Sequence, residues 1–145
     1  MIEEKHIEAY LKTLEEKGPD GDFLEQEDLM DYLKSDTFDS LNSSERKTLF
    51  FCFEAIFYSY ALAKNEPLEF DIDDFLDAEE DNWEIRDGIK SWSETKDVFF
   101  KNYAQEDLLA FIEDTLVDDE SEEESFSDIG REVIFISCKS YIDLI

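Results

Sequence analysis

Residues 49–63, LFFCFEAIFYSYALA, form the most apolar run of the chain and decide its fold class. The run is too short to span a bilayer and carries Glu54 in its middle, so we interpret it as a core helix. Helix signals on either side extend it from about Asn42 to about Asn65, just before Pro67. The sequence therefore predicts one long central helix, around which the remaining segments pack.

The chain before this central helix has the pattern of two shorter helices. Apolar side chains recur at helical spacing at Ile7, Tyr10, Leu11 and Leu14. Gly18 followed by Pro19 is a typical end for such a helix. A second helix is predicted to begin near Asp22, whose carboxylate would cap the first turn while Glu25 closes a capping box.

The chain after the central helix predicts three further helices before its final segment. One begins near Asp71 and ends near Gly88, and a short one begins near Ser93. The next carries one apolar stripe, formed by Leu108, Leu109, Ile112 and Leu116. The acidic run 117–128 is expected to be a mobile loop, because like charges over that length favour an extended chain.

The C-terminal segment, residues 127–145, fits two patterns. Its VIFIS core is β-branched, which favours a strand near residues 132–138 and an α+β fold. Helical spacing extends over a greater length, and a lone strand could not satisfy its own backbone, so we predict a helix. The predicted fold is all-α, a single compact domain of residues 1–145 with about six or seven helices.

Acidic residues dominate the charge of the chain. The 145 residues include 41 Asp and Glu against 13 Lys and Arg, which gives a formal net charge of −28. This charge repels nucleic-acid phosphates and anionic membranes, so direct binding to either is not expected. A basic protein or a divalent cation is the natural electrostatic companion, and of these we predict a basic protein partner. Composition makes no prediction of the oligomeric state. The charged N-terminus lacks the apolar run of a signal peptide, so we expect a cytoplasmic protein.

Known catalytic and cofactor motifs are not found in the sequence. His6 is the sole histidine, and the glycines form no phosphate-binding loop. The stretch GPDGDFLEQEDL, residues 18–29, fails the calcium-loop pattern, because Phe23 replaces the turn glycine and Leu29 the bidentate glutamate. Cys52 and Cys138 both lie in apolar segments, where we expect buried thiols; a disulfide or metal pair is the alternative. We therefore predict a non-enzymatic protein without a cofactor.

A magnesium-dependent hydrolase of nucleotides is the alternative enzymatic hypothesis. Helical hydrolases hold the metal with carboxylates three or four residues apart. Such a set could be formed by Glu80, Glu84, Asp87, Glu94 and Asp97. In so acidic a chain this spacing also arises often by chance, so it is weak support.

The preferred hypothesis is a non-catalytic acidic module that binds a basic protein partner. Tryptophan flanked by charge is typical of interfaces, and charged rims around an aromatic anchor accelerate association. The predicted binding residues are Asp71, Asp73, Asp74, Asp77, Glu80, Trp83 and Trp92. An inhibitor that imitates DNA phosphates and an immunity-type protein that neutralises a basic toxin are two forms of this hypothesis. A third reading is that the acidity serves solubility alone.

Overall fold

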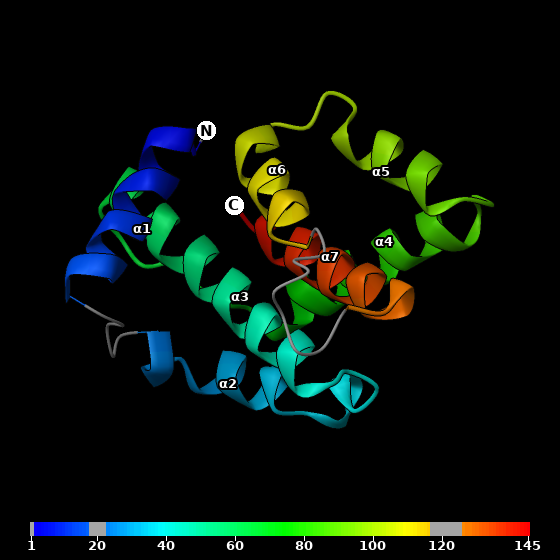
Figure 1. Ribbon diagram of the computed structural model, residues 1–145, viewed down its shortest axis with the longest axis horizontal. Coiled ribbons are helices and arrows are strands. Elements are labelled where there is room, and N and C mark those ends of the chain that lie inside the picture. The colour runs from blue at the N-terminus through cyan, green and yellow to red at the C-terminus, as the bar shows by residue number, and fades with distance from the viewer. Residues whose placement is uncertain (1, 18–22, 117–125) are drawn as a thin grey trace.

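The computed structural model describes residues 2–17, 23–116 and 126–145, and its centre is the long apolar helix α3 (Ser43–Lys64) (Figure 1). Asn42 begins this helix with a complete capping box, in which its side chain accepts from the Glu45 backbone N–H. Asn65 ends it in the left-handed conformation, with φ of 57°. The predicted central helix is confirmed at both ends.

The C-terminal segment forms a helix, α7 (Asp128–Ile142), that packs against α3. The ring of Phe53 on α3 stacks on Tyr141 of α7, with centroids 4.9 Å apart. All the regular structure in the described residues is helical, so the alternative strand near 132–138 is wrong. Seven α-helices form one compact all-α domain there, as predicted.

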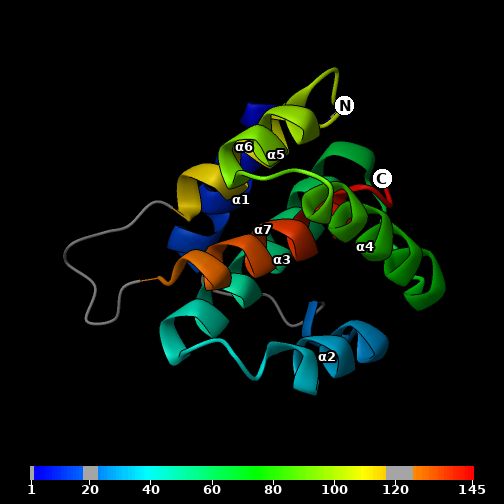
Figure 2. The ribbon, with the colours of Figure 1, turned by 90° about the vertical axis from the view of Figure 1, so that its right-hand side faces the viewer.

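Three helices connect these two central helices. The helix α4 (Ile72–Asp87) packs along α7, and Asp71 caps it by accepting from the Asp73 and Asp74 backbone N–H groups (Figure 2). The short helix α5 (Trp92–Phe100) begins after Ser91, close to the predicted start. The helix α6 (Glu106–Thr115) buries Leu108, Leu109 and Ile112 against α7 and α3, which confirms the predicted stripe.

The N-terminal helix α1 (Glu4–Lys17) packs along α3. The predicted second helix begins later than expected: a 3-10 turn, η1 (Phe23–Glu25), precedes α2 (Glu27–Leu33). Phe23 is fully buried and its backbone N–H donates to the Tyr58 hydroxyl at 3.1 Å, which fixes the chain in a turn. A second 3-10 turn, η2 (Asp36–Phe38), leads to α3. The proposed cap at Asp22 lies outside the described residues, as does most of the predicted acidic loop.

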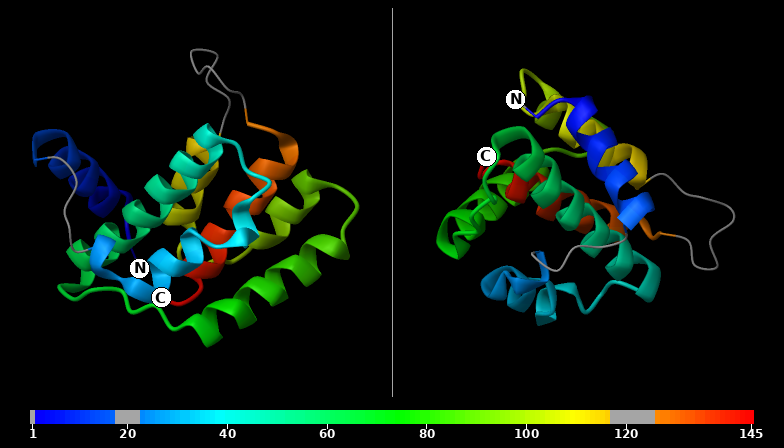
Figure 3. Two further views of the ribbon diagram at one scale, coloured as in Figure 1. Left: turned by 90° about the horizontal axis from the view of Figure 1, so that it is seen from below. Right: turned by 90° about the vertical axis from the view of Figure 1, so that its left-hand side faces the viewer.

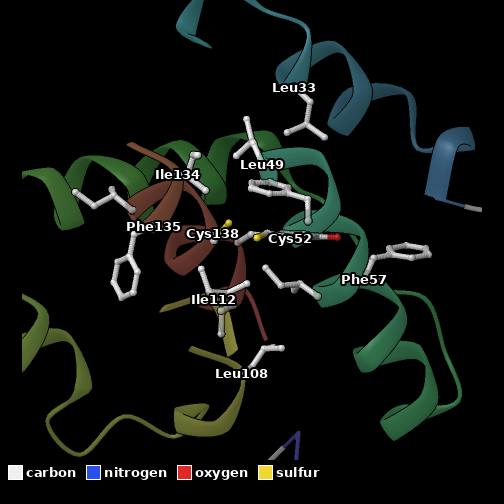
Figure 4. Close-up of a cluster of buried hydrophobic side chains, with 14 of the residues drawn as sticks. Leu33, Leu49, Cys52, Phe57, Leu108, Ile112, Ile134, Phe135 and Cys138 are labelled. Carbon is white, nitrogen blue, oxygen red and sulfur yellow. The ribbon is translucent and has the colours of Figure 1, made fainter. Parts of the chain in front are cut away.

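Both cysteines lie in the core between α3 and α7 as free thiols (Figure 4). Burial raises the pKa of the Cys138 thiol, and a hydrogen bond with Cys52 raises it further. Both cysteines therefore behave as small apolar core residues, as the sequence predicts. Within the described residues, the length and apolar content needed to cross a membrane are not reached by any helix.

Candidate functional site

An acidic groove of about 550 Å³ lies between α4 and the C-terminal end of the chain. Figure 3 shows the C-terminal end beside the start of α4. Its carboxylate-bearing lining residues are Glu69, Asp71, Asp74, Asp77, Asp81 and Asp143. Ala78 and Leu144 complete the wall. We call this feature the α4 groove.

The helical period explains why α4 supplies most of these carboxylates. Phe75 and Asn82, seven residues apart, face the core and are buried. Asp74, Asp77 and Asp81 follow the same kind of spacing on the flank next to that buried face, and all three are exposed. The amphipathic pattern that buries α4 thus also aligns its acids along the groove.

Asp143 is the one groove carboxylate with a cation beside it in the described residues. Its two oxygens accept from the Lys139 ammonium at 3.1 and 2.9 Å, and Oδ2 also accepts from the Asn82 amide at 3.0 Å. The Tyr103 hydroxyl donates to Oδ1, and the pKa of Tyr103 is raised by burial and by this carboxylate. Four donated hydrogen bonds hold Asp143 in place.

The other five carboxylates of the groove make no ion pair with the described part of the chain. Asp71 is engaged locally as the helix cap, accepting from two backbone N–H groups at 3.0 and 3.2 Å. Glu69, Asp74, Asp77 and Asp81 thus concentrate negative charge on one concave surface. Such a surface attracts cations, because a concave wall of low dielectric focuses the field of its charges.

The structure divides the predicted binding residues into two groups. Asp71, Asp74 and Asp77 line the groove. The remaining four, Asp73, Glu80, Trp83 and Trp92, are not part of its lining. By the helical period, Asp73, Glu80 and Trp83 lie on the other flank of α4.

Neither tryptophan is a freely exposed anchor. Trp83 and Trp92 are both half-buried and pack against the hydrophobic core. The Trp92 ring meets Phe135 edge to face at a centroid distance of 5.2 Å, and the Arg86 guanidinium lies 6.0 Å from its centroid. Arg86 also forms a two-pronged ion pair with Glu132 of α7. Trp92 thus connects α5 to α7.

The alternative metal-binding residues are distributed over two helices. Glu80, Glu84 and Asp87 lie on α4, and Glu94 and Asp97 on α5. All five are exposed. Among the described residues, no three His, Cys, Asp or Glu side chains lie in an arrangement that could hold a metal ion.

Three groove carboxylates, Glu69, Asp81 and Asp143, are not among the predicted binding residues. Asp81 could have been found, because it lies seven residues after Asp74 on the same helix flank. Glu69 and Asp143 come from segments far apart in the chain, and only packing brings them together. No family model, curated protein or solved structure matches the chain.

Proposed function

We propose that the protein is a non-catalytic interaction module that binds a basic protein partner in the cytoplasm through the α4 groove. The observation that supports this proposal is that five carboxylates other than Asp143 line one concave surface and make no ion pair with the described residues. Lys or Arg side chains of a partner would neutralise them. The net charge of −28 adds a long-range attraction that orients and accelerates the encounter.

The chemistry of the groove suits guanidinium and ammonium groups. Arg offers a planar fork of donors that fits a carboxylate, and Lys offers a compact charge. Asp143 already accepts four hydrogen bonds, so we expect Asp74, Asp77, Asp81 and Glu69 to make the direct contacts. Partners that carry clustered Lys and Arg include DNA-binding proteins and basic toxins. Competition by double-stranded DNA for the captured partner distinguishes these two kinds of partner.

The experiment compares three baits that differ only in surface charge. The wild type is matched with a groove variant, Asp74→Asn with Asp77→Asn and Asp81→Asn. The control variant, Asp73→Asn with Glu80→Gln and Asp87→Asn, removes the same charge from exposed positions of α4 outside the groove. Each bait captures proteins from a lysate of the source organism, and mass spectrometry identifies them. We expect the wild type and the control to retain one basic protein that the groove variant loses.

Two outcomes would contradict the proposal. Equal capture by all three baits would show that total charge, and not the groove, attracts basic proteins. Magnesium-dependent turnover of nucleotides that Glu80→Gln or Asp97→Asn abolishes, with no basic partner recovered, would support the hydrolase alternative.

A further inference from the structure

A separate groove of about 330 Å³ lies between α1 and α6. Its floor is apolar and consists of Ile7 and Leu11 from α1 with Ala110 and Phe111 from α6. Leu11, Ala110 and Phe111 are only half-buried, so part of this apolar surface is uncovered. The volume lies at the small end of the range for ligand clefts, about 300–1,000 Å³, and suits anchoring side chains of a larger partner.

Carboxylates from both helices complete the lining of this groove. Glu4 and Glu8 come from α1, and Asp107 and Asp114 come from α6, one turn before and one turn after its apolar pair. None of these four makes an ion pair with the described residues. This arrangement differs from the α4 groove, where carboxylates form most of the wall.

Hydrogen bonds hold the starts of the two helices together. The Ile2 backbone N–H donates to the Gln105 amide oxygen at 2.9 Å, and the Glu4 backbone N–H donates to the Asp107 carboxylate at 3.1 Å. Figure 1 shows α1 and α6 starting at the same end of the molecule. Each helix contributes positions i, i+3, i+4 and i+7, so the groove extends for two turns, about 10 Å.

The position of Asp114 favours a cationic ligand. It lies in the last turn of α6, where the helix dipole disfavours a carboxylate, and no basic residue occupies that turn. A Lys or Arg side chain bound beside Asp114 would offset this local repulsion.

We propose that this groove binds an amphipathic helix of a basic protein, independently of the α4 groove. The apolar face of that helix lies on the floor, and its Lys or Arg side chains, one or two turns apart, pair with the carboxylates of the lining. A second copy of this chain is disfavoured as occupant by its charge of −28. The same repulsion disfavours residues 117–125, which carry six acids and no base.

The test uses a synthetic helical peptide with Leu on one face and Lys on both flanks. A second peptide of equal charge has Gln in place of Leu. Amide chemical shifts of the labelled full chain report the binding position. We expect the Leu peptide to shift residues 4–11 and 107–114, and the Gln peptide to bind about tenfold more weakly, since a loss of about 1.4 kcal/mol is tenfold.

Variants separate the contribution of the apolar floor from that of the carboxylates. Ala110→Trp fills the groove, so we expect about tenfold weaker binding of the Leu peptide. Glu8→Gln with Asp114→Asn should weaken it about threefold, whereas Glu15→Gln with Glu16→Gln, which removes equal charge from exposed positions of α1 outside the groove, should have little effect. Far-ultraviolet circular dichroism and thermal unfolding check that each variant folds.

The proposal would be overturned by shifts centred on residues 69–81, or by equal affinities for the Leu and Gln peptides. The proposal would also be overturned if Ala110→Trp and the Glu8→Gln, Asp114→Asn variant both bound the Leu peptide as tightly as the wild type. The Asp74→Asn, Asp77→Asn, Asp81→Asn variant tests this groove separately from the α4 groove. It should still prefer the Leu peptide, because its substitutions lie outside the groove between α1 and α6.

Discussion

Glu45 is a buried carboxylate that joins the N-termini of two helices. Oε1 accepts from the Asn42 backbone N–H at 2.9 Å, at the start of α3. Oε2 accepts from the backbone N–H and the hydroxyl of Ser127, each at 3.0 Å, where Ser127 caps α7. The positive ends of two helix dipoles thus surround one negative charge, which stabilises it away from water.

Gly130 provides the space for this carboxylate. A Cβ at residue 130 would lie 1.7 Å from Glu45 Oε2. We predict that Gly130→Ala displaces Glu45 from its hydrogen bonds and lowers the free energy of unfolding by about 2–3 kcal/mol in urea titration. Gly88→Ala is the control, because its Cβ would meet its nearest atom at an ordinary 3.5 Å. Equal stabilities of the two variants would show that the hydrogen bonds of Glu45 do not contribute to the stability of the fold.

Glu79 gives a prediction for the pH dependence of stability. Burial raises the pKa of Glu79, and the hydrogen bond from the Tyr32 hydroxyl only partly lowers it again. A raised pKa in the folded state means that this group stabilises the fold below its unfolded pKa of about 4.3 and loses that contribution as pH rises.

We therefore predict that Glu79→Gln, which keeps an acceptor for Tyr32, is more stable than the wild type at pH 7. The difference should shrink as the pH falls towards 4. Urea titrations at four pH values would measure it. A difference that grows on acidification would show that Glu79 is stabilised as a carboxylate.

At the scale of elements, α4 and α7 are joined by a buried polar network. The Lys139 ammonium lies between Asn82 and Asp143 and is 4.8 Å from the Tyr103 ring centroid. The Asn82 amide also donates to the Ser140 hydroxyl at 3.0 Å. Directional bonds of this kind fix how the two helices lie against each other, and α4 in turn positions the groove carboxylates.

We predict that Lys139→Met lowers the free energy of unfolding by about 2–3 kcal/mol, because it leaves Asp143 without its cation. A double-mutant cycle with Asp143→Asn should give a coupling of about 1–2 kcal/mol. Lys5→Met, which breaks the exposed pair with Glu3, is the control and should cost less than about 0.5 kcal/mol. Additive effects of Lys139→Met and Asp143→Asn would contradict this role of the pair.

The helices could be predicted from the sequence wherever their signals are local. Asn42 and Asp71 cap α3 and α4 with their own side chains, so both helix starts were visible. The side chain of Gln26 does not cap α2. The 3-10 turn that precedes α2 is instead held by the burial of Phe23 in the core. Local propensity could not reveal that constraint.

The candidate site could be predicted only in part, for the same physical reason. Asp74 and Asp77 share one helix flank, which the sequence period reveals. Asp143 joins them through packing of α7 against α4, more than sixty residues along the chain. The charged residues around Trp83 and Trp92 predict an interface role for both, whereas in the structure both rings pack against the hydrophobic core.

The whole molecule has a large excess of negative charge on a small domain. Self-repulsion among these charges destabilises the compact state, most strongly when few counterions screen it. We predict that the melting temperature rises by several degrees between about 10 mM and 500 mM sodium chloride. Scanning calorimetry at matched pH measures it, and the groove triple variant should show a smaller increase. A melting temperature independent of salt would indicate that the charges are already balanced by pairing.

The central claim, that the α4 groove recruits a basic protein, is tested most directly by association kinetics with the captured partner. Surface plasmon resonance would compare the wild type, the groove variant Asp74→Asn, Asp77→Asn, Asp81→Asn and the control variant Asp73→Asn, Glu80→Gln, Asp87→Asn between low and high salt. We predict that the groove variant associates about tenfold more slowly at low salt, that the control stays close to the wild type, and that added salt removes the difference. Equal association rates for the two variants would contradict the claim.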